Sequence, residues 1–405
     1  MQTKIYLLSI TLLFLNVTCH AINNSPDSTR LPPVETKAPN SDYKPAFTGQ
    51  TRIAGVKTST PYKVEKIAED LGSPFAIVPM PDGRLMITIK SGYMEIHNAN
   101  GKLEKKITGL PDVYNVGQGG LLDVTFDQDF ARNKTMYWSY SEKYEQGSLT
   151  TVAKGILNEA AGKVENVTVI FRATPATDSP LQYGSRFVFD KDGNLFVSIG
   201  EKSIPQARVQ AQQLDSYLGK IVRITTSGKP APGNPFLNKA GAKPEIYSYG
   251  HRNPDGLEMN PATGELWESE FGPRGGDEIN IIHPGKNYGW PVITYGIDYS
   301  GKKMGEGIQQ QAGMEQPVYY WDPVISPSGM TFYTGNRVPE WENNLFIGAL
   351  SGKHIVRLAI ENNKVIGEER LLTQENQRFR DVTQGSDGAL YAVTDEGRLY
   401  KIDKK

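Results

Sequence analysis

Apolar and polar residues alternate along most of this chain in short runs that are joined by tight turns. Alternation with a period of two on both sides of a turn rich in Gly, Asp and Asn predicts a β-hairpin. The clearest hairpin segments begin at Phe75, Phe187 and Val382. Looser copies with longer turns begin at Leu122, Leu257 and Met330.

The spacing of these hairpins predicts a ring of repeated units. Successive hairpins start roughly 50 to 75 residues apart, which leaves room for a second hairpin in each unit, as a four-stranded blade requires. A single blade cannot bury both of its faces, whereas blades stacked around an axis bury one another. We therefore predict an all-β fold over residues 62–405, a six-bladed β-propeller whose long inter-blade loops form the site at one mouth. The runs near Tyr62 and Ile402 are expected to share one blade, which closes the ring without exposed strand edges.

The start of the chain has the pattern of an export signal. Lys4 precedes an apolar run that ends at Val17 and is too short to span a bilayer comfortably, and small residues follow. We predict a signal peptide over residues 1–21 and a flexible, polar and Pro-rich tether over residues 22–61. Alternatively, Cys19 is the first mature residue and carries a lipid anchor. In either case we expect an exported protein, periplasmic or anchored at the cell envelope.

Composition removes several classes of partner and chemistry. The 405 residues are 38% hydrophobic and carry a formal net charge of -1, which is typical of a globular protein. A balance this near to neutral gives no electrostatic footprint for nucleic acid. We expect no nucleic-acid partner and no transmembrane span. Cys19 is the only cysteine, so neither a disulfide nor a Cys-ligated metal is expected in the folded part.

Residues 247–301 are unusually rich in Gly, Pro, carboxylates and aromatic residues, with little uninterrupted apolar sequence. Such a stretch forms loops, which expose backbone carbonyls. These carbonyls lie beside Asp277, Glu278, Arg252 and Asn253. One region therefore offers oxygen ligands together with cationic and amide donors, a mixture that favours a calcium ion and an anionic ligand.

Polar loop residues next to the other hairpins extend this candidate site. Cations directed at one mouth of a propeller repel one another unless an anion lies between them, and an Arg fork suits a carboxylate. The pattern therefore predicts a polyanionic ligand. The candidates are Gln118, Gln182, Arg186, Arg252, Asn253, Tyr299, Lys353, Arg378 and Arg380.

A series of motifs in fixed order resembles the soluble PQQ-dependent glucose, sorbosone and aldose sugar dehydrogenases. They are GQGGLLD, GSR before a hairpin, LGKIVRI, GHRNPDGL, EFGPRGGDEIN, NYGWP, PSGM and RFRDV, and they extend roughly from Tyr62 to Ile402. The resemblance implies a calcium-dependent six-bladed propeller. It also implies oxidation of aldose sugars at C1 to lactones, with PQQ as cofactor and an electron acceptor that the sequence leaves unidentified.

The same resemblance implies roles for individual residues. The positions that match those holding the PQQ cofactor are Gln118, Arg252, Asn253, Tyr299, Arg378 and Arg380, together with Lys353 at a shifted position. The carbonyls of Gly272 and Pro273 match those that join PQQ in holding one Ca²⁺. Glu278 and the Tyr288 carbonyl match a second calcium site that looks structural.

Gln182 stands where the family has its general-base histidine, next to the motif that begins at Gly184. A neutral amide cannot accept a sugar hydroxyl proton with useful basicity. The presence of Gln182 therefore predicts that sugar oxidation is impaired or depends on another base, for which His251 is one candidate. We expect Arg252 to contribute to the same reaction. Two alternatives stay open: a non-catalytic propeller that binds PQQ, a sugar or a partner, and a calcium-dependent lactonase, which the arginine set disfavours.

Overall fold

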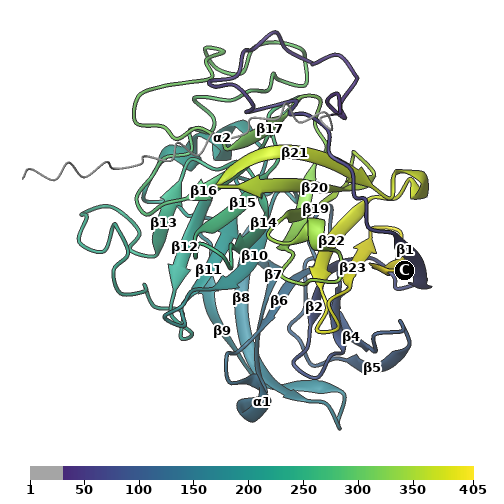
Figure 1. Cartoon of the computed structure of the whole chain (residues 1–405). Coiled ribbons are helices and arrows are strands. Elements are labelled where there is room, and N and C mark those ends of the chain that lie inside the picture. The colour runs from purple at the N-terminus through teal and green to yellow at the C-terminus, as the bar shows by residue number, and fades with distance from the viewer. Residues whose placement is uncertain (1–30) are drawn as a thin grey trace, which may run out of the picture. The chain divides into compact units, whose positions relative to one another are not determined.

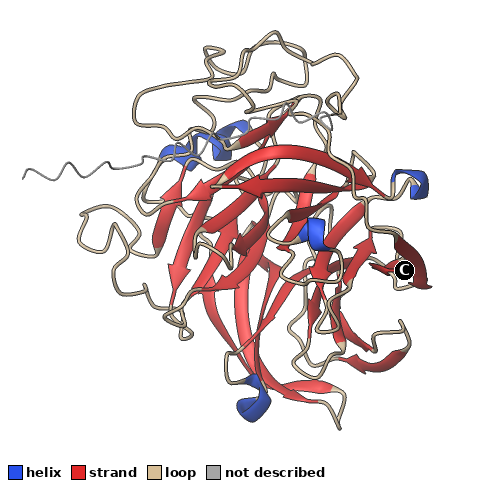
Figure 2. Ribbon diagram, viewed as in Figure 1, coloured by secondary structure: helices blue, strands red, loops and turns tan. Residues whose placement is uncertain are grey.

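The alternating runs form four-stranded antiparallel sheets in the computed structural model, which describes residues 31–405. Six such sheets follow one another along the described chain and form the blades of a propeller (Figures 1 and 2). Each predicted hairpin supplies the two inner strands of one blade, because the innermost strand leads through a tight turn into its neighbour. The prediction of a six-bladed β-propeller is confirmed.

The first three blades are formed in chain order. Blade one contains β2 (Pro74–Pro79), β3 (Leu85–Ile89), β4 (Tyr93–His97) and β5 (Leu103–Ile107). Blade two contains β6 (Leu121–Phe126), β7 (Thr135–Tyr144), β8 (Gly147–Asn158) and β9 (Lys163–Arg172). Blade three contains β10 (Gly184–Phe189), β11 (Leu195–Ile199), β12 (Lys220–Ile224) and β13 (Ile246–Tyr249).

The last three blades complete the ring, and short helical turns connect some of the strands. Blade four contains β14 (Pro254–Met259), β15 (Leu266–Glu270), β16 (Asp277–Ile282) and β17 (Tyr319–Trp321). Blade five contains β18 (Pro327–Phe332), β19 (Leu345–Ala349), β20 (His354–Glu361) and β21 (Lys364–Leu371). Blade six contains β22 (Phe379–Gln384), β23 (Leu390–Thr394), β24 (Leu399–Lys404) and β1 (Tyr62–Ala68). The turns are α1 (Phe130–Asn133), α2 (Pro205–Arg208), η1 (Val209–Gln212), η2 (Pro339–Trp341) and η3 (Thr373–Glu375).

Blade six is shared between the two ends of the propeller sequence, as predicted. Strand β1 pairs antiparallel with β24, with Tyr62 opposite Lys404 and Val64 opposite Ile402. The blades then pack on one another through large side chains such as Trp138 and Trp267, neither of which is exposed to solvent. Full burial of each large apolar side chain contributes about 1.5–3 kcal/mol, so these interfaces make the ring a rigid support for its loops.

Buried charges fill the channel between the innermost strands. The Arg186 guanidinium on β10 lies 3.1 Å from Asp381 on β22 and 3.8 Å from Asp123 on β6. One cavity lies where the innermost strands begin and a second lies where they end, and all three of these charged residues line the second cavity. Arg186 therefore bridges blades inside the channel. We expected it to line the candidate site at the first mouth, and it does not.

Residues 31–61 are not a flexible tether. This segment, which we call the arm, packs against blades four and five and hydrogen-bonds to Asp322, Glu368 and Glu369. The prediction of a tether is wrong for these residues, because their polar groups are satisfied by the propeller instead of by water. The rest of the predicted tether, the predicted signal peptide and Cys19 lie outside the described residues. Within residues 31–405, no helix is long and apolar enough to cross a membrane.

Candidate functional site

A cavity of about 570 Å³ opens at the mouth where the innermost strands begin. Loops from several blades line it, because strands β2, β6, β10 and β14 all start at this end of the channel. The structure brings together nine of the residues that the sequence singled out: Gln118, Gln182, Arg252, Asn253, Gly272, Pro273, Tyr299, Arg378 and Arg380.

The charges in this cavity are only partly balanced. Four cations line it, Lys90, Arg252, Arg378 and Arg380, and three carboxylates accompany them, Asp255, Asp277 and Asp395. Asp395 lies 2.8 Å from both Arg378 and Arg380, and Arg380 lies 3.2 Å from Asp255. Burial alone would raise the pKa of Asp395, but the two guanidinium groups hold it below its usual value. The cations that remain suit a ligand that carries carboxylates.

Arg252 links the cationic part of the cavity to the turn at Gly272. Its Nη1 donates to the Gly272 carbonyl at 2.7 Å, and its Nη2 donates to the Tyr299 hydroxyl at 3.3 Å. Within the described residues its Nε has no hydrogen-bond partner. Arg252 is therefore held in place and keeps a donor for a ligand. Tyr299 is 66% exposed and forms an open wall of the mouth.

Two amide side chains support the loop that carries Gln182. The Gln182 backbone N–H donates to Gln118 Oε1 at 2.7 Å, and the Gly184 N–H donates to Asn253 Oδ1 at 3.0 Å. Because both amide oxygens are used in this way, the NH₂ groups of Gln118 and Asn253 are the atoms left to donate to a ligand. The Gln182 side chain lines the cavity, and its own Oε1 is buried without a donor among residues 31–405.

The turn from Gly272 to Asp277, which we call the carbonyl turn, contributes Gly272, Pro273 and Asp277 to the lining of the cavity. Asp277 closes the turn: its Oδ1 accepts from Gly272 N at 2.7 Å, and its Oδ2 accepts from the backbone N–H groups of Ile325 and Ser326. Burial raises the pKa of Asp277 to about 7, although these N–H groups oppose the rise. A side chain at Gly272 would meet Gly275 O at 2.3 Å, so the turn requires glycine there. The carbonyl oxygens of this turn, at Gly272 and Pro273, suit a hard cation such as Ca²⁺.

Three carboxylates gather beside this turn: Glu268 and Glu270 are buried and Glu278 is half-buried. Asn280 Nδ2 lies 3.1 Å from Glu268 Oε2 and 3.3 Å from Glu278 Oε2, while Glu270 is within 3.5 Å of the same nitrogen. Burial and neighbouring carboxylates raise the pKa values of Glu268 and Glu278 well above their usual range. Glu268 Oε1 has no partner in the described part of the chain. This oxygen-rich set, to which the Tyr288 backbone is adjacent, fits a calcium ion.

Strand pairing explains why these carboxylates meet. Glu268 and Glu270 lie on one face of β15, opposite Asn280 and Glu278 of β16. Sequence reasoning singled out Glu278 but missed Glu268 and Glu270. The signal was present, because acidic residues at alternating positions of two successive strands point to the same face of a sheet.

Other predicted site residues lie elsewhere. None of the histidines in residues 31–405 lines the cavity. His251 is fully buried, its Nε2 lies 2.8 Å from Ser248 Oγ and its ring stacks on Tyr288, so it is not placed to replace the missing base. Lys353 is exposed and is not among the residues that line the cavity, although Leu350 of the same turn is. A cofactor contact from Lys353 stays a prediction.

The turn after β11 carries two charged residues that sequence reasoning missed. Glu201 donates its N–H to Arg252 O at 2.9 Å, and burial raises the pKa of its carboxyl to about 7 although Arg252 opposes the rise. Lys202 is buried with its Nζ 3.1 Å from the centre of the Tyr183 ring, and burial lowers its pKa to about 6. A charged pair after a strand ordinarily indicates a solvated turn, so no sequence signal pointed to this arrangement.

Comparison with known proteins agrees with this geometry. The sequence model of the Glucose / Sorbosone dehydrogenase family matches residues 71–401. The chain belongs to this family. Aldose sugar dehydrogenase YliI of Escherichia coli is 43% identical over 347 residues, which cover 84% of this chain and 93% of that protein. Membership of the family identifies the chain as an oxidoreductase of the sugar dehydrogenase type.

Solved structures of the family superpose on the same propeller. The soluble aldose sugar dehydrogenase of Escherichia coli, solved in the apo-form, has a TM-score of 0.81 and 42% identity and covers 85% of this chain and all of its own. The PQQ-bound aldose sugar dehydrogenase of Streptomyces coelicolor has a TM-score of 0.70 and 26% identity, and the match covers 86% of this chain and 100% of that one. Both relatives therefore share the whole propeller with this chain.

Proposed function

We propose that this chain is a PQQ- and calcium-dependent dehydrogenase that oxidises aldose sugars at C1 to lactones. The observation that carries the proposal is the cavity in which Arg252, Arg378 and Arg380 meet the carbonyl turn at Gly272 and Pro273. One half of the cavity suits the carboxylates of PQQ, and the other half suits a hard cation. A small apolar ligand would leave these buried polar groups without partners.

The residues divide into three binding groups. Arg252, Arg378 and Arg380 would hold the PQQ carboxylates, with the NH₂ groups of Gln118 and Asn253 as further donors. The carbonyls of Gly272 and Pro273 would hold one Ca²⁺, and Glu278 with the Tyr288 carbonyl would hold a second. When bound, PQQ supplies the oxidant that takes two electrons and two protons from the C1–H and O–H groups of the sugar, and Ca²⁺ acts as a Lewis acid.

The chain's own residues would orient the sugar more than they would activate it. Tyr299 leaves the mouth open to solvent, so the site can admit sugars of different sizes. Gln182 can hold a sugar hydroxyl through a hydrogen bond, but its amide takes no proton at neutral pH. Loss of a positioned base typically costs about 10²–10⁴-fold in rate, so we expect slow oxidation.

Gln182 also favours a second candidate, a propeller that binds PQQ without oxidising sugar. The two functions separate in one experiment: reconstitution of the purified protein with PQQ and Ca²⁺, followed by an assay of aldoses with an artificial electron acceptor. Slow turnover that depends on both PQQ and Ca²⁺ supports the dehydrogenase. A PQQ-dependent rise in melting temperature without turnover supports the binding protein. If PQQ produces neither turnover nor a rise in melting temperature, the proposal of a PQQ site is contradicted.

We also propose that the protein is exported, on the basis of residues 1–21. Mass spectrometry of the mature protein from a cell-envelope fraction tests this. A mature N-terminus at Ile22 supports cleavage by a signal peptidase, and a lipid-modified Cys19 supports the anchored form. An intact Met1 in the mature protein would contradict both.

A further inference from the structure

Residues 31–55 of the arm form a closed loop whose two ends meet on blade five. Leu31 and Gly55 exchange backbone hydrogen bonds at 3.2 and 3.0 Å, and Val56 N–H donates to Glu368 O on β21 at 3.0 Å. Figure 1 shows the arm in dark purple beside the long green connection between β16 and β17. The family match begins at residue 71, so the arm lies outside it.

The tip of the arm surrounds the carboxylate of Asp322, the residue after β17. Asn40 donates to Asp322 Oδ1 from both its backbone N–H and its side-chain NH₂, each at 2.8 Å. Ser41 donates to Asp322 Oδ2 from its backbone N–H and its hydroxyl, each at 3.1 Å. Arg52 adds a bond from its guanidinium to the Asp322 carbonyl at 2.7 Å. Five donors from the arm therefore converge on one buried residue.

Asp322 in turn lies against the carbonyl turn of the candidate site. A Cβ atom on Gly275 would be only 2.9 Å from the Asp322 carboxylate, and Gly276 N–H donates to Trp321 O at 2.9 Å. Arg274, in the same turn, donates from its Nε to Asn40 Oδ1 at 3.1 Å. The arm therefore contacts the turn both directly and through Asp322.

A second anchor holds the same part of the arm. Gln50 is fully buried; its Nε2 donates to Pro317 O at 2.9 Å, and its Oε1 accepts from the Tyr295 hydroxyl at 3.1 Å. Tyr295 precedes Gly296, where a Cβ would lie 2.8 Å from the Pro273 ring. The turn from Gly272 to Asp277 is thus enclosed by segments that the arm holds.

We propose that the arm is a built-in clamp, with Asn40 and Asp322 as positioning residues that hold the Gly272–Asp277 turn in its binding geometry. Groups that support metal ligands typically change metal affinity about 10–100-fold when they are removed. This inference rests on the proposed function for its effect on Ca²⁺ and PQQ, but the contact between the arm and the turn does not. If the arm only stabilised the fold, loosening it at any point would lower the stability of the protein. If the arm is a clamp, loosening its tip changes the Gly272–Asp277 turn, and loosening its other end does not.

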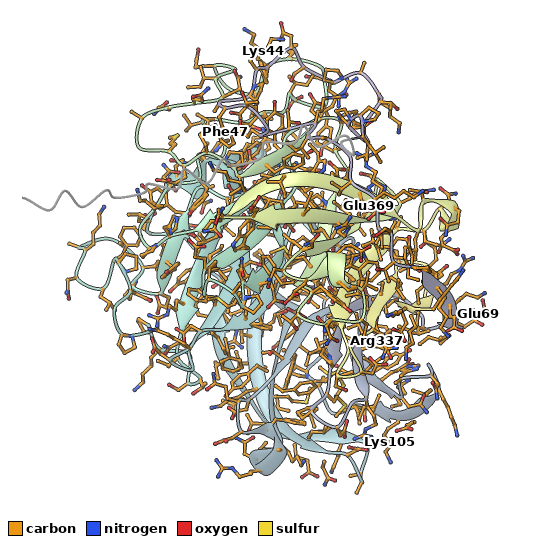
Figure 3. The ribbon with its side chains drawn as sticks, in the orientation of Figure 1. Lys44, Phe47, Glu69, Lys105, Arg337 and Glu369 are labelled. Atoms are coloured by element: carbon orange, nitrogen blue, oxygen red, sulfur yellow. The ribbon has the colours of Figure 1, made fainter. Side chains whose placement is uncertain are left out.

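Three variants separate these roles. Asn40→Ala removes the side-chain bonds from Asn40 to Asp322 and to Arg274, and Asp322→Ala removes the carboxylate that accepts from Asn40 and Ser41. Glu340→Ala is the matched control, because Glu340 binds Ser59 and Thr60 at the other end of the arm. Figure 3 labels Lys44 and Phe47, which lie near the tip of the arm at the top of the view. It also labels Glu369 of β21 lower down, which binds Thr58 near the other end of the arm.

Hydrogen exchange of the protein without added ligands gives the first readout. We expect the amides of Gly272 and of residues 274–277 to exchange about tenfold faster in Asn40→Ala, as the net loss of about one hydrogen bond implies. They should exchange faster still in Asp322→Ala, which removes the acceptor of four bonds, and be unchanged in Glu340→Ala. Titration with Ca²⁺ and PQQ gives the second readout, with weaker binding by about 10–100-fold in the first two variants only. In the double variant the effects should add only in part, because both substitutions remove the bond between the Asn40 side chain and Asp322.

Unchanged exchange of the turn in Asn40→Ala and Asp322→Ala would overturn the clamp, and so would equal acceleration in Glu340→Ala. If the wild-type protein binds neither Ca²⁺ nor PQQ, the proposed function fails, while the exchange rates still decide whether the arm holds the turn.

Discussion

The backbone N–H of Gln182 donates to Gln118 Oε1 at 2.7 Å, which holds position 182 at the wall of the cavity with a φ of 48°. His is among the residues that adopt this left-handed region more readily than most. We therefore expect Gln182→His to be accommodated and to raise kcat of the reconstituted enzyme by about 10²–10⁴-fold. The pH profile should acquire a new rise with a midpoint near that of an imidazole, about 6.5.

Gln182→Asn is the matched control for this substitution. Asn also tolerates the left-handed region but remains a neutral amide, so its rate should stay near that of the wild-type protein. A Gln182→His enzyme that is no faster than Gln182→Asn would show that the cavity does not place residue 182 against the reacting hydroxyl.

Lys202 should destabilise the protein in a pH-dependent way. Its buried Nζ has no acceptor in the described chain, and burial lowers its pKa to about 6 from 10.5. Between these two pH values the unfolded chain binds the proton and the folded protein does not, so the cost of Lys202 falls as the pH rises. We expect Lys202→Met to stabilise the protein by about 1–3 kcal/mol at pH 7. Denaturant unfolding should show this gain shrinking towards pH 10; a gain independent of pH would contradict the assignment.

Arg378 and Arg380 should differ in what they contribute. The Arg380 side chain is mostly buried between Asp255 and Asp395, whereas the Arg378 side chain is 40% exposed and pairs with Asp395 alone. Arg380→Ala should lower the free energy of unfolding by about 3–5 kcal/mol, because it leaves the buried Asp255 carboxylate without its cation. Arg378→Ala should leave stability nearly unchanged and weaken PQQ binding by about tenfold, as loss of one charge-assisted hydrogen bond implies. Equal effects of both variants on the melting temperature would contradict this division.

The carboxylates around Asn280 should make stability depend on Ca²⁺. A cation that binds the folded protein alone stabilises it by about 2.7 kcal/mol at a concentration 100 times its Kd. We expect Ca²⁺ to raise the melting temperature of the wild-type protein and to have much less effect on Glu278→Gln. Glu315→Gln, which changes a carboxylate paired with Lys286 at the surface, is the control and should respond like the wild type. An equal rise in all three proteins would place the calcium elsewhere.

The blades could be predicted from the sequence because the signal for them is local. Alternation around turns such as Pro81–Gly83 and Lys191–Gly193 sets both the strand and its partner, and six such hairpins imply the ring. Motif order then located the loops that meet at the mouth, including Arg252 and Gln182. The assigned roles of these residues remain predictions until ligands are tested.

The arm and Lys202 could not be predicted because their environment depends on distant residues. The Pro-rich segment around Asn40 is polar, and composition cannot show that Asp322, some 282 positions away, satisfies its donors. Lys202 is likewise buried, with its Nζ against the ring of Tyr183 from another loop. Long-range partners of polar groups leave no local pattern, so sequence reasoning predicted a flexible tether for the arm and did not single out Lys202.

Equilibrium titration of the ligand-free protein with PQQ tests the central claim most directly. Calorimetry with Ca²⁺ present, and again with a chelator, reports binding without requiring turnover. We predict one PQQ per chain, bound far more tightly with Ca²⁺ than with the chelator, because the Gly272 turn and the arginines act on one ligand together. No binding of PQQ under either condition would contradict the account.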